Sequence, residues 1–577
     1  MKKAQIKKSV SALAMAAIIA VSLFGYGCGA KPASTSSDAG VSGDFTGTAK
    51  GFGGDVSVTL TLTDGAITGC TAEGKDETQG VGSEAIAKMP GEIAESGSIA
   101  VDGVSGATVT STAIKEAAAA ALTAAGLNPD DYKTAVEKTG SAEDSTVEAD
   151  VVVVGAGGAG MTAAITAAAE GKSVVILESQ SMVGGNSVRA TGGMNAGKTV
   201  YQDENEFGES AGVEKTLKTA AEKYADNATI TALAKTVSEQ WAAYQADPKG
   251  YFDSVELMEL DTMIGGKGIN DPALVETLCS NSADAIDWLD EHGITLHNVS
   301  SFGGASVKRI HRPVNAEGKT VSVGSYMIPL LQENCEKAGV KMMLDTTATE
   351  ILTDANGAAV GVKATGASGE TVTVNAKAVV LTTGGFGANL DMVVKYKPEL
   401  KGFMTTNAAG IQGQGIEMAE AIGAATVDMD QIQIHPTVEA NTAALITEGL
   451  RGDGAVLINA EGKRFIDEVG TRDVVSAAEI AQTGSYSWLV VDQAMVDASS
   501  VIQGYIKKGY TVTGQTYEEL AKAMGVDEAA FAETMKTWNG YVAAKNDPDF
   551  GRTSFANPLD TAPYYAIKVT AGVHHTM

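Results

Sequence analysis

Side chains that bind anions and carry protons are concentrated toward the C-terminal end of this sequence. The chain has six histidines, and three of them lie in two short segments, Gln433–Thr437 and Val573–Thr576. Between these segments come a Thr-Glu-x-x-Arg run at 447–451 and an Arg-Asp pair at 472–473. Imidazole, hydroxyl and guanidinium groups all donate hydrogen bonds to carboxylates. Taken singly, the Glu-Arg pair also fits a surface ion pair, and the Arg-Asp pair fits a turn. The candidate residues are His435, Thr447, Glu448, Arg451, Arg472, His574 and His575.

The chain as a whole is strongly acidic, so a local group of Arg and His side chains is unusual in it. The 577 residues carry a formal charge of −29, with an isoelectric point of about 4.6. Nucleic-acid binding needs a basic face, so this composition argues against it. An acidic protein can still act on a small anion if a few Arg and His side chains gather in one cleft. With 44% hydrophobic and 20% charged residues, the chain is long enough for two or three buried cores.

The elements that would position a cofactor begin at an apolar strand, Val151–Val154. A glycine-rich turn, an Ala-rich helix and a second strand follow, and the second strand ends at Glu178. Gly155 allows the tight turn, Gly157 lets the backbone approach a pyrophosphate, and Glu178 can bind ribose hydroxyls. This order of strand, GxGxxG, helix and acid is the dinucleotide-binding fingerprint. The sequence therefore predicts an α/β fold with a dinucleotide site.

A separate small module precedes this motif. Residues 56–63 alternate apolar and hydroxyl side chains, which predicts a strand. Helices are expected near 82–88 and over 112–125, and a polar turn at 102–111 leads into the second helix. By composition alone this turn is a helix N-cap.

The turn nevertheless resembles a known family. The run Asp102-Gly-Val-Ser-Gly-Ala-Thr108 looks like the FMN-binding domain in which FMN is joined to Thr through its phosphate. The resemblance implies a covalent FMN on Thr108, attached by a flavin transferase. The neighbouring hydroxyls at 110–112 are alternatives.

The dinucleotide module also has family resemblances. The loops 184–187 and 191–195 resemble those of FAD enzymes in the fumarate reductase and succinate dehydrogenase superfamily. No His occurs in 184–197, and covalent FAD in that superfamily uses a His there, so noncovalent FAD is implied. The implied cofactor-binding residues are Gly155, Gly157, Ala159, Gly160, Glu178, Asn186, Ser187, Thr191, Gly192, Gly193, Ala348, Gly384, Gly385 and His575.

The ordered His, Thr, Glu and Arg set resembles fumarate reductases of the flavocytochrome c type. By that resemblance His435 and Thr447 hold one substrate carboxylate and His574 holds the other. Arg472 would be the proton donor, resupplied through Glu448 and Arg451. The expected reaction is hydride transfer from FAD to fumarate, giving succinate, with electrons relayed through FMN. Urocanate, cinnamate or methacrylate reduction, and a flavin electron-transfer lipoprotein, remain alternatives.

The N-terminus reads as an export signal. Lysines precede an apolar stretch, Ser9–Phe24, and small residues then lead to Cys28. The context of Cys28 resembles a bacterial lipoprotein, which implies lipid attachment on the extracytoplasmic side of the cell membrane and a membrane electron donor. Simple secretion is the alternative. At the other end, the family continues past Met577 with a glycine-rich segment and an Arg, so a C-terminally incomplete chain is expected.

The expected architecture is α/β: a dinucleotide-binding FAD domain with an inserted α+β capping domain, preceded by a small α+β FMN-binding domain. No metal-ligand spacing is present, and three cysteines, Cys70, Cys279 and Cys335, are expected as buried thiols. The expected segments are a signal peptide (1–27), a linker after the lipidated Cys (28–46), the FMN-binding domain (47–126), a linker (127–148), the first FAD-binding part (149–307), the capping domain (308–425) and the second FAD-binding part (426–577).

Overall fold

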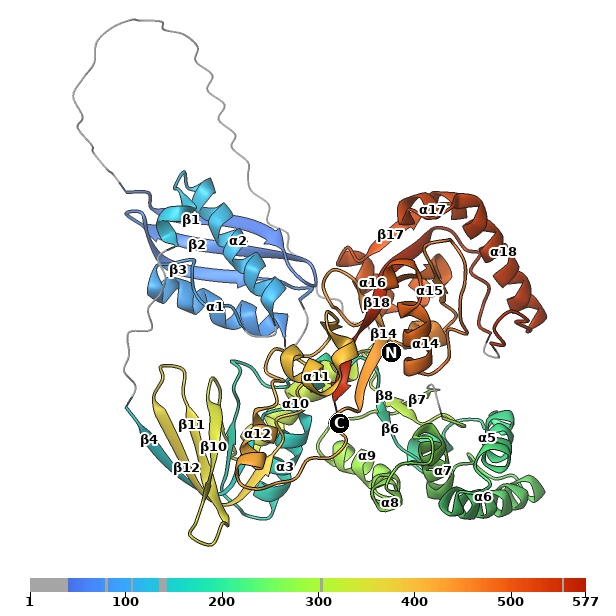
Figure 1. Ribbon diagram of the computed structural model, residues 1–577. Coiled ribbons are helices and arrows are strands. Elements are labelled where there is room, and N and C mark those ends of the chain that lie inside the picture. The colour runs from blue at the N-terminus through green and yellow to red at the C-terminus, as the bar shows by residue number, and fades with distance from the viewer. Residues whose placement is uncertain are drawn as a thin grey trace, which may run out of the picture.

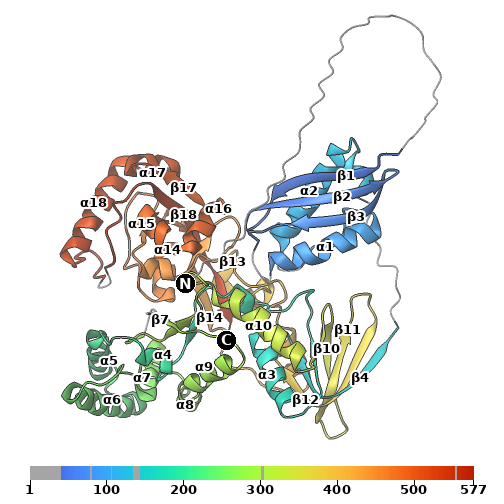
Figure 2. The ribbon, with the colours of Figure 1, turned by 180° about the vertical axis from the view of Figure 1, so that it is seen from behind.

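The structure is a computed structural model that describes residues 40–77, 81–104, 107–133, 143–300, 305–552 and 555–576. The expected signal peptide and Cys28 lie outside these residues, as does the side chain of Thr108. Figures 1 and 2 show the chain folded into an N-terminal unit, a sheet-containing unit below it, a helical region and a C-terminal unit.

The N-terminal unit, residues 40–133 and called here the FMN unit, is a three-stranded antiparallel sheet with two helices (Figure 1). In β2 the buried residues Val56, Val58, Leu60 and Leu62 alternate with more exposed ones, so that one face of the sheet meets the helices. The strand expected at 56–63 is therefore confirmed. The elements are β1 (Gly43–Lys50), β2 (Asp55–Thr63), β3 (Ala66–Glu73), α1 (Gly82–Ser96), α2 (Thr108–Ala124) and a 3-10 turn (Pro129–Tyr132).

The second unit, called the FAD unit, is built on a six-stranded sheet in the order β10-β11-β12-β4-β5-β9. Strands β12, β4, β5 and β9 are parallel neighbours, and β10 and β11 complete an antiparallel edge. The Val run of β4 is buried because helices cover a parallel sheet on its faces. The elements are β4 (Ser145–Val154), α3 (Gly158–Ala169), β5 (Val174–Leu177), α10 (Val323–Lys337), β9 (Lys341–Met343), β10 (Thr347–Thr353), β11 (Ala359–Thr365), β12 (Thr371–Leu381), α11 (Leu390–Tyr396) and α12 (Gln414–Ala421).

A helical region joins β5 to α10 and contains a small sheet in the order β6-β8-β7 (Figure 1). Its core buries Trp241, Tyr251 and Phe252. The elements are η2 (Ser187–Arg189), β6 (Met194–Asn195), α4 (Val200–Asp203), α5 (Ser210–Lys223), α6 (Ala228–Ala246), α7 (Val255–Gly265), α8 (Pro272–Ser280), α9 (Ser282–Glu291), β7 (Asn298–Ser300) and β8 (Ile310–Arg312).

The C-terminal unit, residues 404–576 without α12 and called the cap unit, has its own sheet in the order β13-β18-β16-β15, with β14 and β17 also pairing with β18. The 13-residue strand β18 is its central element. The elements are β13 (Met404–Thr405), β14 (Ile432–Glu439), α13 (Gly449–Gly452), β15 (Val456–Ile458), α14 (Arg472–Ile480), β16 (Ser487–Asp492), α15 (Gln493–Ala498), α16 (Ser500–Lys507), β17 (Thr511–Gly514), α17 (Tyr517–Met524), α18 (Glu528–Ala544) and β18 (Tyr564–Thr576).

This strand pairing corrects the expected capping domain at 308–425. Strand β12 pairs with β4, β9 pairs with β5, and β11 and β10 extend the same sheet beyond β12, so all four strands, within residues 341–381, belong to the FAD unit. The separate sheet forms instead from 404–576, which includes the segment expected to complete the FAD-binding domain. The error arises because strand order is set by long-range pairing. The register of Ala378 beside Val151, for example, leaves no mark in the local sequence.

In the described part of the chain, no helix is long and apolar enough to cross a membrane. Cys279 and Cys335 are buried free thiols, as expected, whereas Cys70 is half-buried.

Candidate functional site

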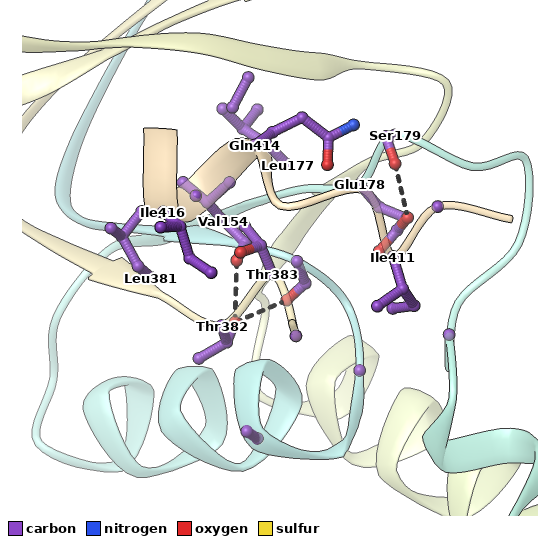
Figure 3. Close-up of a pocket in the computed structure, with 18 of the residues that line it drawn as sticks. Val154, Leu177, Glu178, Ser179, Leu381, Thr382, Thr383, Ile411, Gln414 and Ile416 are labelled. Carbon is purple, nitrogen blue, oxygen red and sulfur yellow. Dashed lines mark hydrogen bonds between the residues drawn. The ribbon is translucent and has the colours of Figure 1, made fainter. Parts of the chain in front are cut away.

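A cavity of about 620 Å³ lies at the carboxyl ends of β4 and β5, where the dinucleotide fingerprint predicted a ligand (Figure 3). Its volume falls within the range of cofactor sites, roughly 300–1,000 Å³. Backbone of the glycine-rich turn, the end of β5, the turn after β12 and α12 form its walls. Its lining includes Gly155, Gly157, Ala159, Glu178, Gln180, Asn186, Ser187, Thr346, Ala348, Thr382, Gly384, Gly410 and Gln414.

The glycines of the turn are required by close backbone approaches. Gly155 has a φ of +106°, and a Cβ there would lie 2.5 Å from the carbonyl oxygen of Thr382. A Cβ on Gly160 would lie 1.9 Å from the oxygen of Gly155. Thr382 Oγ1 donates to the carbonyls of Val154 (2.9 Å) and Gly155 (3.1 Å), which ties β12 to the turn (Figure 3). The turn is therefore fixed in shape.

Gly157 serves a different purpose, because it faces the cavity. A Cβ there would meet no protein atom closer than 3.8 Å, so a methyl group would occupy space that a ligand could use. Gly157 is also the N-cap of α3, a 12-residue helix whose N-terminus favours a phosphate. This position suits a pyrophosphate.

Glu178, the residue after β5, also lines the cavity. Its Oε2 accepts a hydrogen bond from Ala156 N–H (2.8 Å), and its Oε1 accepts one from Gln180 N–H (2.9 Å). Burial raises the pKa of the Glu178 carboxyl, and these backbone N–H groups oppose that shift. Ser179 Oγ donates a third hydrogen bond to Oε1 (3.4 Å; Figure 3). A carboxylate has about four acceptor positions, so one remains for a ribose hydroxyl.

Asn186 connects the cavity to the cap unit. Its Nδ2 donates to Asn407 Oδ1 (2.7 Å), and its Oδ1 accepts from Ala408 N–H (2.7 Å). Asn407 Nδ2 in turn donates to the carbonyl oxygen of His574 (3.2 Å). The loop expected to lie along the flavin is therefore linked through Asn407 to β18, the strand that carries two candidate histidines.

The predicted cofactor residues divide into two groups. Eight of them line the cavity: Gly155, Gly157, Ala159, Glu178, Asn186, Ser187, Ala348 and Gly384. The others lie outside this lining: Gly160, Thr191, Gly192, Gly193, Gly385 and His575. Gly385 instead packs against β18, because a Cβ there would lie 1.8 Å from Thr576 Oγ1. His575 is exposed on the same strand.

The candidate catalytic residues lie together in the cap unit. His435 is on β14 opposite Gly572 of β18, and the His435 and His574 ring centroids are 5.0 Å apart. Glu448 caps α13, which carries Arg451, and Arg472 is the first residue of α14. Helix α14 packs against both β14 and β18. Residues far apart in the sequence are thus assembled as the resemblance implied.

His435 is held neutral and in one tautomer. The N–H of Thr437 donates to its Nδ1 at 3.2 Å, so Nδ1 is an acceptor and Nε2 carries the proton. The side chain is 1% exposed. Burial, followed by the charge of Arg472, lowers the His435 pKa well below its usual value. His435 therefore presents a neutral N–H donor at physiological pH.

His574 is neutral for similar reasons. Burial is the main cause that lowers its pKa to about 4, and Arg472 adds to the shift. Its Nδ1 is hydrogen-bonded to Thr406 Oγ1 at 2.8 Å. The two imidazoles are thus oriented hydrogen-bonding groups rather than cations.

Glu448 bridges the two arginines. Its Oε1 accepts from Arg451 Nη2 (2.9 Å), and its Oε2 accepts from Arg472 Nη2 (2.7 Å) and Nε (3.0 Å). Arg472 Nη1 also donates to Gln433 Oε1 (2.7 Å). Burial lowers the pKa of Arg451, which is 1% exposed. Such charge-assisted bonds fix both guanidinium planes.

Thr447 precedes this bridge, and a tyrosine positions it. The Thr447 N–H donates to Tyr505 Oη (3.0 Å), and Tyr505 Oη donates to the carbonyl of Leu445 (3.4 Å). The loop between β14 and α13 is therefore anchored on α16.

Comparison with known proteins agrees with this geometry. The model for the FAD binding domain family matches residues 150–251 and 241–577, and the model for the FMN-binding domain matches 51–123. The chain belongs to this FAD-binding family of oxidoreductases. It also has an N-terminal FMN-binding domain.

Several relatives in this family act on unsaturated acids. The NADH:fumarate oxidoreductase of Klebsiella pneumoniae (strain 342) is 39% identical over 83% of this chain, which spans 46% of that relative's length. The urocanate reductase of Eggerthella lenta is 34% identical over 96% of this chain and 86% of its own length. The solved structure of the open conformation of a flavocytochrome c3 fumarate reductase is 34% identical, with a TM-score of 0.57, covering 75% of this chain and 68% of that one.

The FAD-binding family and the cavity agree on the cofactor. The space at Gly157 for a phosphate and the remaining acceptor position of Glu178 fit FAD, and Asn186 and Asn407 connect the cavity to His574. For FMN, the 17-residue helix α2 begins at Thr108, so its N-terminus is placed to stabilise a phosphate.

Four contributing residues were not predicted from the sequence: Gln180, Thr406, Asn407 and Gln433. Gln433 had a local signal, because it lies two residues before His435 and so extends from the same face of β14. The roles of Thr406 and Asn407 depend on partners more than a hundred residues away, which the sequence does not show. Gln180 lies two residues after Glu178 and lines the cavity from the same loop.

Proposed function

We propose that this protein reduces the C=C bond of an unsaturated carboxylate, and that the substrate is fumarate, which is converted to succinate. The observation that supports this most strongly is the pair of neutral histidines, 5.0 Å apart, beside an arginine pair bridged by Glu448. Bound FAD would supply the hydride. The chain's own residues then have to hold the acid and deliver one proton.

Each residue has a role that follows from its contacts. His435 Nε2–H and the Thr447 hydroxyl bind one carboxylate, and His574 binds the other. Arg472 is the proton donor, with Glu448 and Arg451 behind it as the resupply route. A guanidinium is a weak acid, with a pKa above about 12. Burial, with the charge of Arg472, lowers the pKa of the Arg451 guanidinium, so Arg451 gives up a proton more readily than an arginine in water.

Two carboxylate-binding groups on β14 and β18 favour a dicarboxylate over a monoacid. Urocanate carries one carboxylate and an imidazole, and its reduction is the second candidate because of the 34% identity to a urocanate reductase. The products distinguish the two functions. Proton NMR of the reaction mixture is expected to show one succinate formed for each two electrons consumed from a reduced dye. Dye oxidation by fumarate without succinate would contradict the proposal.

The carboxylate role of His435 has its own test. We expect His435→Ala to raise the KM for fumarate roughly 10- to 100-fold, because a hydrogen bond to a charged group is worth about 1.5–3 kcal/mol. The effect on kcat is expected to be smaller, because the Arg472–Glu448–Arg451 bridge does not involve this ring. Steady-state kinetics measures both, with His292→Asn, a half-buried histidine after α9, as the matched control. An unchanged KM would show that His435 does not bind the substrate carboxylate.

Electrons are proposed to reach FAD from a covalent FMN on Thr108. Support comes from direct packing of the two units. Met182, which precedes the cavity loop, is buried in the core of the FMN unit, and Lys88 Nζ donates to the carbonyl of Ser181 (2.5 Å). Lys508 of the cap unit lies 3.4 Å from the centre of the Phe52 ring. The FMN unit is therefore positioned beside residues 180–185 of the FAD cavity.

The maturation proposals share one measurement. We propose export, cleavage before Cys28 with lipid attachment there, FMN transfer to Thr108 by a flavin transferase, and reduction by a membrane donor. The intact mass of protein from the membrane fraction is expected to show loss of 1–27 and gains for one lipid group and one FMN. Thr108→Ala is expected to remove only the FMN mass, and Cys28→Ala only the lipid mass and the membrane association. Wild-type protein without either addition would contradict both modifications.

A further inference from the structure

The short helix α13 carries Arg451 and follows Glu448, so its position fixes both groups. It has only four residues, Gly449–Gly452. A helix of this length is not stable by itself in water, because nucleation costs more than so few hydrogen bonds return. Within this described segment the Glu448 side chain caps no backbone N–H, since its carboxylate is bonded to Arg451 and Arg472. Other parts of the chain must therefore hold α13 in place.

Arg552, 101 residues after Arg451 in the sequence, supplies such a hold. Its Nη2 donates to the carbonyl oxygen of Arg451 (2.8 Å), and its Nη1 donates to the carbonyl oxygen of Ala455 (3.1 Å). Arg451 lies within α13, and Ala455 follows the helix closely. A guanidinium at the C-terminal end of a helix bonds to the carbonyls there and offsets their partial negative charge. Arg552 therefore caps α13 from outside the helix.

The Arg552 side chain is itself fixed by a buried carboxylate. Its Nη1 also donates to Glu468 Oε2 (3.0 Å), and the side chains of both residues are 0% exposed. The backbone carbonyl of Glu468 accepts a hydrogen bond from Arg451 Nη1 (2.6 Å). Arg552 and Glu468 thus hold Arg451 at two points, its backbone carbonyl and its guanidinium.

A second arginine binds the same carboxylate but not α13. Arg464 donates from Nε to Glu468 Oε1 (2.7 Å), and from Nη2 to Glu468 Oε2 (2.8 Å) and Asp547 Oδ2 (2.9 Å). The Cζ atoms of Arg464 and Arg552 lie 4.2 Å and 4.9 Å from the centre of the Trp538 ring. In the described part of the chain, Arg464 forms no hydrogen bond with α13. The two arginines share their surroundings, and the contact with α13 distinguishes them.

We propose that Arg552 is a positioning residue for the proton route. Its guanidinium holds the carbonyl end of α13, so that the Glu448 carboxylate stays where Arg451 and Arg472 both reach it. Without that hold, α13 shifts and the bonds from Arg472 to Glu448 lengthen. Misplacement of a catalytic group by about 1 Å can lower a rate about 100-fold. This inference rests on the proposed function.

Kinetics of two matched substitutions test the proposal. Arg552→Lys keeps the positive charge, but an ammonium lacks the planar set of donors that reaches both carbonyls and Glu468. We expect its kcat for fumarate to fall about 10- to 100-fold, with KM little changed because Thr447 is anchored separately on Tyr505.

The control is the same substitution at the second arginine. Arg464→Lys disturbs the same buried cluster without removing a contact to α13, so it should lower Tm about as much as Arg552→Lys and keep kcat near the wild-type value. Equal losses of kcat in the two variants would overturn the proposal, because the effect would then follow from the stability of the cluster alone.

Amide hydrogen exchange measures the hold on α13 without turnover. The N–H groups of residues 453–455 donate to carbonyls of α13. In holoprotein with Arg552→Lys, mass spectrometry of a peptide covering 446–456 should show exchange at least about tenfold faster than in wild type, because a bond from a charged donor is lost. In Arg464→Lys this peptide should exchange as in wild type. An unchanged exchange rate in Arg552→Lys would overturn the proposal.

These measurements separate the inference from the proposed function. If wild-type protein reduces no unsaturated acid, the proposed function is refuted, and exchange in 446–456 still decides whether Arg552 holds α13. If wild-type protein reduces fumarate and Arg552→Lys exchanges faster with kcat unchanged, the hold does not serve the proton route and the proposal is overturned. Faster exchange together with a lower kcat, in Arg552→Lys alone, is the result we expect.

Discussion

Replacing Arg472 by alanine is expected to lower kcat for fumarate reduction by about 100- to 10,000-fold, the usual contribution of a positioned proton donor. Its guanidinium is held by two bonds to Glu448 and one to Gln433, so it is fixed before substrate arrives. The flavin absorption spectrum should not change, because Arg472 is not part of the FAD cavity lining. Stopped-flow reoxidation of the reduced protein by fumarate measures the step directly.

The control for this variant is close in space. Lys267 pairs with Asp473, the residue after Arg472, at 3.1 Å, and it is exposed. Lys267→Ala should therefore leave the rate unchanged. Arg472→Lys keeps the positive charge but lacks the planar set of N–H donors of a guanidinium, so a partial loss of kcat is expected. Full activity in Arg472→Ala would refute the proton-donor role.

Glu448→Gln is expected to have the second largest effect, a fall in kcat of about 100-fold or more within the range for lost proton transfer. The carboxylate is the shared acceptor of Arg451 and Arg472, and an amide offers one acceptor in place of two. The variant would leave the buried Arg451 without its anion. Removing one partner of a buried pair costs about 3–5 kcal/mol, so Tm should fall as well.

A matched variant distinguishes a loss of stability from a loss of catalysis. Glu439, on β14, is also buried and accepts bonds from Asn441 and Thr442. Glu439→Gln should lower Tm while leaving kcat nearly unchanged. If Glu448→Gln and Glu439→Gln lower kcat equally, the loss is structural and Glu448 is not part of the proton route.

Local patterns in the sequence predicted the strand, turn and acidic residue at the centre of the FAD unit. The Val run of β4, Gly155 and Glu178 form one continuous segment, so their spacing predicted the strand, turn and acid that the structure contains. The division into units was not predictable in this way. Strands β12 and β9 join the sheet by long-range pairing with β4 and β5, and the boundary expected at 308–425 was wrong for that reason.

The same distinction applies to the site. Resemblance identified His435, Glu448 and Arg472, because they lie in short recognisable motifs. Asn407 has no such motif, and its importance follows from a partner more than a hundred residues away. Unit contacts and desolvation are properties of the folded chain.

The structure also refines the charge argument. The sequence suggested that two arginines and two histidines would offset the acidic chain at an anion site. Burial and Arg472 keep both imidazoles neutral, so the positive charge comes from Arg451 and Arg472, partly balanced by Glu448. The site itself therefore has a small net positive charge and several oriented hydrogen-bond donors, and these would attract an anion.

The most direct test of the proposed function compares acids as oxidants of the reduced holoprotein. Protein reduced by a dithionite-reduced dye is mixed with fumarate, urocanate, cinnamate or methacrylate, and dye oxidation is followed. The two carboxylate-binding groups predict a kcat/KM for fumarate well above that for each of the others. Rapid oxidation by urocanate or another monoacid, with no response to fumarate, would contradict the proposal.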